Sequence, residues 1–549
     1  MKIGIAKKLV YLSIALTTAA PLYTQDAATG AISGVVYDPS NRVVVHAEVL
    51  TVNEATHVSR SVVTTAEGVF RVPLLPPGAY AVTVKAAGFA ENTSPSIQVT
   101  VSKTASLNVT LTIAGVSQSV QVGDKASVAE LESSTLGGVV DETAIRSLPL
   151  SNRNYTQIIG LSPGVMVDLP TATALGRGTQ NVASNGATPT QNNIQFNGID
   201  ANNMAENSAA SAETSIVGVA IPAPDTIQEF RVQTANYDAA YGRSAGANVD
   251  LVSKTGSNQF HGSAWEFVRN NIFNANDFFS KLRGQPRADL KHNQFGASLG
   301  GPIWKDKTFF FVAYQGLTEV NGLGDQTSAT LPLLTQDRSA ATLGAQFCPA
   351  GHLNSQGQPA TGYFTQAGGL QVACDGSNIN PVALAVLNAK LSNGQFAVPS
   401  PQVALPNTGT DPTNQFPVGQ STFSIPAHYR EDQFSVNLDQ ALSSKNTLSE
   451  RFFYSRAPTV TAFSGSGTAN VPGWPTNELD RNTMFVMADT QIFSSNLINV
   501  ARFGYMRFDG LKSIQNPITA EQIGIDTPTG ATGPTLSAPG MSVGGFTIG

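Results

Sequence analysis

The chain has 549 residues and carries little charge, with a formal net charge of −6 and only 13% charged residues, where globular domains have about 25%. A hydrophobic content of 41% argues against a disordered chain, and 50 glycines with 31 prolines argue against a helical bundle or coiled coil. The acidic balance argues against a nucleic-acid partner, because neutralising phosphates requires clustered Lys and Arg. The length suggests roughly two to four domains, built mainly of β-structure and polar loops.

Residues 1–27 have the layout of a secretory signal peptide. Lys2, Lys7 and Lys8 form a basic start, an apolar run follows over 9–20, and small residues come after it. The run is shorter than the ~20 residues that a membrane-spanning helix needs. An amphipathic N-terminal helix is the alternative, but the pattern favours export.

Short runs between residues 29 and 115 alternate apolar and polar side chains, with turn residues between them. In one run Tyr80, Val82 and Val84 share a face and the residues between them share the other, which is the period of a half-buried strand. A series of such strands predicts a small β-sandwich. The runs cover 31–38, 47–52, 57–65, 70–75, 80–89, 96–101 and 106–113.

The next region, 125–258, mixes helix and strand signals, which predicts an α+β domain. Asp141 is a candidate helix N-cap and Pro149 a terminator. Asn197 and Gly198 stand between apolar residues, which is a strong signal for a hairpin turn. The expected helices cover 142–148 and 155–161, and the expected strands cover 226–234 and 247–256.

Beyond residue 258 the chain has the pattern of long strands with one apolar face. Phe434, Val436 and Leu438 alternate with the polar residues of 433–439, as lipid on one side and water on the other require. We assign four aromatic residues near strand ends to the interfacial belts of such a sheet: Trp265, Phe267, Phe309 and Tyr505.

The connections between these strands alternate strictly between long and short. Outer-membrane barrels have this pattern, with long loops outside and short turns on the periplasmic side, whereas a soluble sandwich with irregular loops gives no reason for it. We therefore predict a transmembrane antiparallel β-barrel. The strand-like runs cover 259–270, 293–302, 308–317, 430–440, 447–456, 483–493 and 497–508.

Cys348 and Cys374 are the only cysteines of the chain. An isolated pair in an exported protein is expected to form a disulfide, and the spacing of these two excludes a CxxC metal or redox site. The alternation of the connections places both in the second extracellular loop.

Two parts of the chain carry family resemblances. The stretch LLPPGAYAVTVKAAGF, 74–89, resembles the signature of carboxypeptidase regulatory-like domains, which implies a transthyretin-like, carbohydrate-binding-like sandwich. The region after it resembles TonB-dependent outer-membrane receptors of the Oar-like kind. There Asn152 stands where the family more often has Gly, and Asn tolerates the left-handed backbone that Gly supplies. The matching segments are 133–141, 148–155, 161–165, 196–203, 224–271 and 293–316.

The receptor resemblance implies a plug domain that fills the barrel lumen and a TonB-type energising protein in the periplasm. Ser119, Val120, Gln121 and Val122 are the candidate TonB box, because they are extended in character and lie just before the plug. Such a segment binds by adding a strand to a sheet of its partner, so that backbone bonds give the affinity. A last sandwich strand or a plain linker is the equal alternative.

Motifs of enzymes and metal sites are incomplete in this sequence. His428 and Glu431 match a zinc motif, but no His follows to supply the third ligand. Residues 242–246, GRSAG, match a nucleophile elbow, but a strand-like run follows where a helix is required. The histidines form no cluster at ligand spacing, and no phosphate-binding fingerprint is present. We therefore expect no enzyme, no metal and no cofactor.

The predicted fold class is mainly β, and the predicted function is transport. We expect a TonB-dependent outer-membrane transporter that takes up a large solute, such as a siderophore or a glycan, by plug gating. Its partners are outer-membrane lipid and the energising protein, with plug and sandwich on the periplasmic side. The alternative is a cell-surface adhesion or carbohydrate-binding protein anchored by its β-region.

The expected domains account for the whole length. Barrels of the resembled transporters have about 22 strands, far more than the runs found after 258, so we expect an incomplete barrel with further strands beyond 549. The parts are a signal peptide (1–27), the sandwich (28–115), a linker with the TonB-box candidate (116–124), the plug (125–258) and a partial barrel (259–549).

Overall fold

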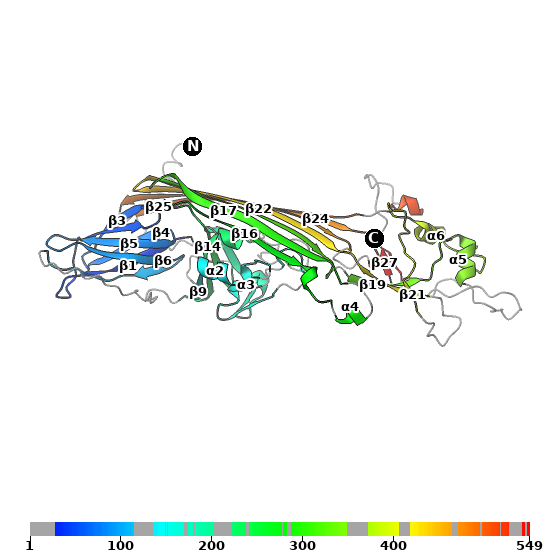
Figure 1. Ribbon diagram of the computed structural model, residues 1–549. Helices are drawn as coiled ribbons and strands as arrows, with labels where there is room; N and C mark the ends of the chain where they lie inside the picture. Colours follow the sequence, from blue (N-terminus) through cyan, green and yellow to red (C-terminus); the bar gives the residue numbers. More distant parts are fainter. Residues whose placement is uncertain are drawn as a thin grey trace, which may run out of the picture.

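The computed structural model is elongated and mostly β, with a sandwich at one end, a long slanted sheet through the middle and a smaller unit at the other end (Figure 1). No helix in the described part of the chain has the length and hydropathy needed to cross a membrane. The described residues are 28–114, 135–148, 150, 152–169, 174–178, 182–202, 222–237, 241–242, 244–276, 278–282, 287–324, 326–347, 372–405, 418–463, 470–494, 497–515, 518–525, 541–543 and 546–548.

The N-terminal unit is the predicted sandwich. Its strands are β1 (Gly30–Tyr37), β2 (Glu48–Asn53), β3 (Ser59–Val63), β4 (Val69–Leu75), β5 (Gly78–Lys85), β6 (Asn92–Val99), β7 (Thr104–Ser106) and β8 (Val109–Thr110). One sheet has the order β4-β1-β7, with β8 also paired to β1, and the other has the order β3-β2-β5-β6. Tyr80, Val82 and Val84 point into the shared core and are at most 2% exposed, as the alternation predicts.

The second unit, here called the plug, is built around a five-stranded mixed sheet with the order β13-β12-β15-β14-β9. Its elements are β9 (Leu136–Asp141), α2 (Glu142–Ser147), α3 (Thr156–Ile159), β10 (Val165–Val167), β11 (Val182–Ser184), η1 (Pro189–Gln191), β12 (Asn193–Phe196), β13 (Ile199–Asp200), η2 (Pro224–Thr226), β14 (Ile227–Ala235) and β15 (Asn248–Ser253). Asp141 caps α2 by accepting a hydrogen bond from the Ala144 N–H at 2.8 Å. Both predicted helices are present, and the second is shorter than expected.

Seven long strands form an antiparallel sheet, here called the wall sheet, with the order β16-β17-β18-β22-β23-β24-β25. They are β16 (His261–Asn270), β17 (Leu290–Trp304), β18 (Thr308–Asn321), β22 (Ala427–Ser443), β23 (Asn446–Thr461), β24 (Thr476–Ser494) and β25 (Leu497–Ile514). Each predicted barrel run overlaps one of these strands, and the connections alternate between long and short as predicted. Within the described residues β16 and β25 each pair on one side only, so the sheet is open.

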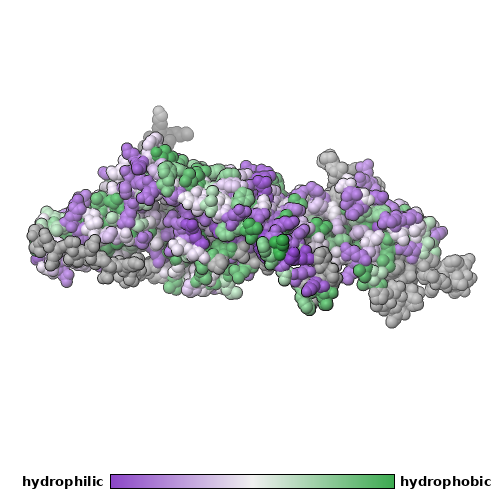
Figure 2. Space-filling view, in the orientation of Figure 1, coloured by the Kyte–Doolittle hydropathy of each residue, from purple (hydrophilic) through white to green (hydrophobic). Residues whose placement is uncertain are grey.

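The wall sheet is apolar outside and polar inside. On β22, Phe434 and Val436 are 45% and 40% exposed, whereas Gln433 and Asn437 are 3% and 2% exposed. A sheet in a water-soluble protein buries its apolar face instead, so the outer face suits lipid, as the alternation predicts. Apolar surface lies along the upper side of the molecule in Figure 2, where the wall sheet runs in Figure 1.

Three of the four aromatic residues assigned to interfacial belts lie on the inner face, so that assignment is wrong for them. Phe309 is only 2% exposed, Phe267 lies under the guanidinium of a plug arginine, and Trp265 shares the face of Phe267. Tyr505 points outward and is 47% exposed. Nearness to a strand end does not fix the face of a side chain, whereas its parity along the strand does.

The long connections contain folded elements of their own. The first holds η3 (Asn271–Phe273) and α4 (Phe278–Leu282), and the others, with the segment after β25, form a compact unit, here called the long-loop unit. Its core joins Leu331, Trp474 and Ile518 from three separate segments. Its elements are β19 (Gln326–Pro332), α5 (Ala340–Phe347), α6 (Pro381–Asn388), β20 (Val403–Ala404), β21 (Val418–Ser424) and η4 (Glu521–Ile523); a hairpin of β26 (Met541–Val543) and β27 (Phe546–Ile548) follows.

Candidate site at the plug–wall interface

The polar inner face of the wall sheet packs against the plug. Phe453 and Met484 of the wall join the apolar core of the plug, and the ring of Phe453 lies 6.2 Å from that of Phe196 on β12. Around this apolar contact the interface consists of charged and hydrogen-bonded side chains.

The first charged contact is a buried ion pair between Arg177 of the plug and Glu431 on β22. Arg177 Nε donates to Glu431 Oε2 at 3.0 Å, and the two side chains are 4% and 8% exposed. Gln433 donates to the other oxygen of Glu431 at 2.7 Å, and Asn154 donates to the Arg177 carbonyl at 3.1 Å. Burying two charges is costly unless further hydrogen bonds satisfy them. The Gln433 bond does this for the Glu431 carboxylate, while the Asn154 bond holds the backbone of Arg177 in place.

A second wall carboxylate, Glu319 on β18, holds the same plug segment. It accepts a hydrogen bond from the Gly176 N–H at 2.7 Å, faces His292 Nδ1 at 3.4 Å and accepts another bond from Asn321 at 2.9 Å. Gly176 has a φ of +60°, and a Cβ there would lie 2.5 Å from the ring of Tyr429. Only glycine fits this close approach.

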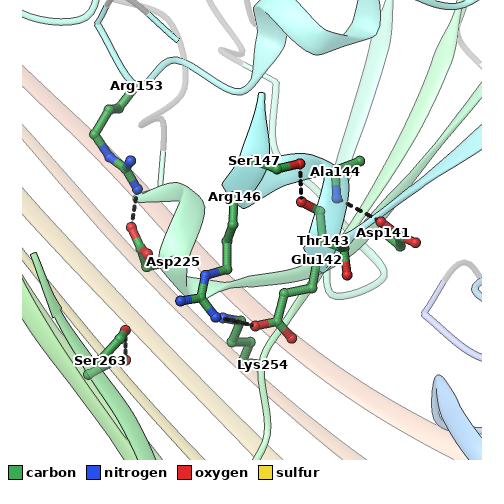
Figure 3. A network of polar contacts seen from close by, with 11 residues as sticks. Asp141, Glu142, Thr143, Ala144, Arg146, Ser147, Arg153, Asp225, Lys254 and Ser263 are labelled. Atoms are coloured by element: carbon green, nitrogen blue, oxygen red, sulfur yellow. Dashed lines mark hydrogen bonds and ion pairs between the residues drawn. The ribbon is translucent and has the colours of Figure 1, made fainter. Parts of the chain in front are cut away.

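Arg153 forms another charged contact between plug and wall. Its guanidinium pairs with Asp225 in η2 and lies 4.2 Å from the ring centroid of Phe267 on β16, and Figure 3 shows the two charged groups pointing toward one another. Burial lowers the pKa of Arg153, and the charge of Asp225 opposes this shift. The left-handed backbone, with a φ of 51°, lies at Arg153 and not at Asn152, so that detail of the resemblance is displaced by one residue.

The end of the plug is tied to the start of the wall. Lys254, directly after β15, donates to Glu142 at 2.8 Å, and Arg146 donates to the same oxygen at 3.3 Å (Figure 3). Asn437 on β22 donates to Ser253 Oγ at 3.1 Å and to the Lys254 carbonyl at 2.7 Å. These bonds fix the point at which the chain leaves the plug and enters the wall.

The sandwich docks on the plug sheet through the loop between β6 and β7. Ser102, with a φ of 51°, bonds Tyr241 Oη at 3.0 Å and donates to Asp250 Oδ2 at 3.1 Å. The same carboxylate oxygen accepts from Tyr241 at 2.6 Å and from Gln233 at 3.0 Å. Burial raises the pKa of Asp250 to about 6 despite these bonds, and burial also raises the pKa of Tyr241.

Glu229 on β14 is the second buried carboxylate under this loop. It accepts a hydrogen bond from the Val101 N–H, while Arg231 donates to the Ser102 carbonyl. Burial raises the pKa of Glu229 to about 7, and the charge of Asp141 adds to the shift. The loop thus covers a polar surface of the plug that would otherwise face water.

A further contact joins the sandwich to the short-turn end of the wall. His57 Nδ1 lies 2.9 Å from Asp306 Oδ1 in the turn between β17 and β18. Asn258 donates to that carboxylate at 2.8 Å and, through its own N–H, to the Ala55 carbonyl at 2.9 Å. Sandwich, plug and wall therefore meet at one end of the wall sheet.

The enzyme-like motifs are not assembled into a site. His428 and Glu431 lie on opposite faces of β22, because their positions differ by an odd number, so they do not face a common metal. Ser244 of the GRSAG segment donates to the Gln191 carbonyl at 2.7 Å. No group of three or more potential metal ligands is found among the described residues.

The other candidate residues fall partly outside the described chain. Asn197 and Gly198 occupy the two positions between β12 and β13, with φ of 51° and 78°, as a two-residue hairpin turn requires. Cys374 is disulfide-bonded, and Cys348 lies outside the described residues. The TonB-box candidate 119–122 lies outside them as well.

Sequence reasoning missed the charged contacts between plug and wall. Glu319 and Glu431 occupy polar positions of alternating strands, in the same parity as buried residues such as Gln433. That parity could have marked both carboxylates as inward-facing. The plug segment that they bind, 174–178, has no alternating pattern that would have marked it in the same way.

Comparison with known proteins assigns most of the chain to two protein-family models. A family model described as an outer membrane beta barrel domain matches residues 252–549, and one described as a carboxypeptidase regulatory-like domain matches residues 31–112. The TonB-dependent transporter Oar of Myxococcus xanthus is 28% identical over 269 residues, which are 46% of this chain and 23% of that protein. The alignment thus spans less than a quarter of this relative.

Solved structures give more distant likenesses. The outer membrane transporter YddB from Escherichia coli is 13% identical with a TM-score of 0.38, over 65% of this chain and 37% of that one. A variant of the ferric enterobactin receptor PfeA from Pseudomonas aeruginosa is also 13% identical with a TM-score of 0.38, over 71% and 43%.

Proposed function

Because the chain belongs to the outer membrane β-barrel family, we propose that it forms part of a TonB-dependent transporter in which movement of the plug admits a large solute. Family membership and the named relative support this class of activity. The protein is located in the outer membrane. We propose a siderophore, a glycan or another large molecule as the solute. We also propose domain limits of 1–27, 28–115, 116–124, 125–258 and 259–549.

The observation that carries the proposal is how the plug is attached to the wall. No backbone ladder joins the two sheets among the described strands. Glu319 and Glu431 on the inner face accept hydrogen bonds from the Gly176 N–H and the Arg177 guanidinium, and Asn437 donates to the Lys254 carbonyl. Such bonds can exchange for bonds to water when the plug moves. A plug held in this way can be displaced without breaking the wall sheet.

The position of the linker suggests how force would act. The segment 115–134 joins the sandwich to β9, which is the edge strand of the plug sheet and pairs only with β14 in the described structure. A pull on this segment reaches Leu136 first and would release β9 from β14 starting at that end.

The energising partner is proposed to add its strand to the TonB-box candidate, Ser119, Val120, Gln121 and Val122. Binding by strand addition depends on backbone N–H groups, which proline lacks. We therefore expect V120P and V122P to abolish binding of the purified periplasmic domain of the cell's TonB-type protein, whereas V120A retains it.

The matched control is V128P, which places proline in the joining segment 115–134 but outside the candidate box. Binding is measured by calorimetry on the purified full chain in detergent. Equal affinity of V120P, V122P and the parent would reject this segment as the box. Loss of binding in V128P as well would favour a plain linker whose extension alone matters.

A further inference from the structure

The outward face of the wall sheet carries a groove at its long-loop end. It has a volume of about 440 Å³ and opens between β17, β18, β22 and β23. Residues that line it include Lys291, Asn293, Thr318, His428, Arg430 and Val460. None of these side chains takes part in the plug contacts described above.

Strand register shows that the groove faces away from the plug. Thr318 pairs with Arg430, and Val320 pairs with both Lys291 and His428. These positions share the parity of Phe434, which is 45% exposed, and alternate with the inward-facing Glu319 and Glu431. In the outer membrane this face meets lipid.

The groove carries an excess of positive charge. Lys291 and Arg430 are exposed, and Arg456 pairs in register with Asp432 on the same face. Asp432 and Arg456 lie beside the lining residues, and over the groove and this edge the three cations against the single carboxylate of Asp432 leave a net charge of +2. Glu319 also borders the groove, but its carboxylate lies on the opposite face, where it accepts the Gly176 N–H and faces His292.

Arg430 is held ready to bind an anion. Its Nε and Nη2 donate to the two oxygens of Asp432 at 3.0 and 3.3 Å, while 61% of its side chain stays exposed. Asp432 also accepts a hydrogen bond from Tyr314 at 2.7 Å. The remaining N–H groups of the fixed guanidinium are available for a phosphate oxygen.

The groove lies directly next to an apolar aromatic band. Tyr314 and Phe434 lie 4.9 Å apart between ring centroids, and Phe295 and Tyr314 lie 6.3 Å apart, all on the outward face. Aromatic residues of this kind mark the boundary between hydrocarbon and headgroups. The basic groove begins two to four residues beyond them along the strands, toward the long-loop end, and is therefore at headgroup depth.

We propose that this groove binds the phosphorylated sugar headgroup of an outer-leaflet glycolipid, that is, of lipopolysaccharide. Lys291, Arg430 and Arg456 meet the phosphates, and Asn293 and Thr318 offer hydrogen bonds to sugar hydroxyls. The site rests on membership of the outer membrane family and on the long-loop end facing outward, but not on transport.

The test is binding of fluorescent lipopolysaccharide to the purified full chain in detergent. Each basic residue near a lipid surface contributes about fivefold, so K291Q with R430Q should weaken binding roughly thirtyfold. The control pair, K305Q with K445Q, makes the same charge change at exposed positions of the short turns and should leave affinity unchanged.

Three further arms make the outcome decisive. T318K adds a charge inside the groove and should tighten binding, which keeps the test valid if the double variant folds poorly. Phosphatase-treated lipopolysaccharide should bind weakly, and phosphatidylglycerol vesicles should compete less well than the intact glycolipid. The proposal would be overturned if treated and intact lipopolysaccharide bound equally well, or if K291Q with R430Q left the affinity unchanged. It would also be overturned if the groove bound inorganic phosphate but not lipopolysaccharide.

Discussion

Arg177 and Glu431 lie 254 positions apart in the chain, yet their side chains meet at 3.0 Å and are 4% and 8% exposed. This pair joins the plug to strand β22 near the long-loop end of the wall sheet. The neighbouring Gly176 is held by Glu319 on the next strand, β18, so two adjacent wall strands grip one short plug segment.

Removing the carboxylate of this pair should loosen the plug. E431Q takes away the negative charge that faces Arg177, and breaking one partner of a buried pair costs about 3–5 kcal/mol. We expect a lower unfolding midpoint and faster proteolysis of the plug, measured on the purified protein in detergent.

The matched control is E266Q, at an exposed position of β16 on the outward face, which should change neither quantity. Combining E431Q with R177M should recover part of the lost stability, because R177M removes the buried positive charge that E431Q leaves unpaired. Strict additivity of the two changes would contradict a direct coupling.

Docking of the sandwich should depend on pH. Because the pKa of Glu229 is raised from 4.5 to about 7, the folded protein keeps a proton that the unfolded chain loses above pH 4.5. The free energy of unfolding should therefore fall as pH rises from about 4.5 to 7, by on the order of 3 kcal/mol. Asp250, with its pKa raised to about 6, acts in the same direction.

Thermal midpoints at several pH values test this expectation. E229Q retains an oxygen that accepts the Val101 N–H and should flatten most of the slope, and adding D250N should remove the rest. An unchanged slope in the double variant would show that other groups cause the pH dependence.

The hairpin turn of the plug offers a test of close packing. Gly198 has a φ of +78°, and a Cβ there would lie 2.7 Å from Arg502 on β25. Gly186 has a φ of +82° with open space around it. G186A should cost about 1–2 kcal/mol from backbone strain alone, and G198A should cost more, since Arg502 must move as well. Equal midpoints would show that Arg502 moves freely.

The disulfide prediction can be checked chemically. Cys374 is disulfide-bonded in the structure, and Cys348 is the only other cysteine of the chain. Titration of the unreduced, denatured protein should find no free thiol, and reduction should lower the stability of the long-loop unit. Finding two thiols per chain would contradict the pairing.

The sequence predicted the strands well because their signal is local. Alternation along β22 placed Phe434 outside and Gln433 inside, and the structure confirms both. Trp265, Phe267 and Phe309 were misplaced because position near a strand end was used where parity decides. Gln294 on β17 faces inward and is 1% exposed. Phe267 on β16 pairs with Gln294 and therefore faces inward as well, and so does Trp265 two residues before it.

Features that join distant segments could not be predicted in this way. The core of the long-loop unit brings Leu331, Trp474 and Ile518 together from separate connections, and no local period marks such a core. The grip of Glu319 and Glu431 on residues 174–178 is equally non-local. The polar surface under Ser102 depends on how two domains dock, which strand patterns do not contain.

The most direct test of the account asks whether the plug opens when the cell is energised. Ser184 on β11 is fully buried at 0% exposure, so S184C should react with a membrane-impermeant maleimide only in energised cells. S392C, at an exposed position of the long-loop unit, should react with or without an uncoupler and serves as the control. We predict that an uncoupler abolishes labelling of S184C and spares S392C; equal labelling of S184C under both conditions would contradict energised plug gating.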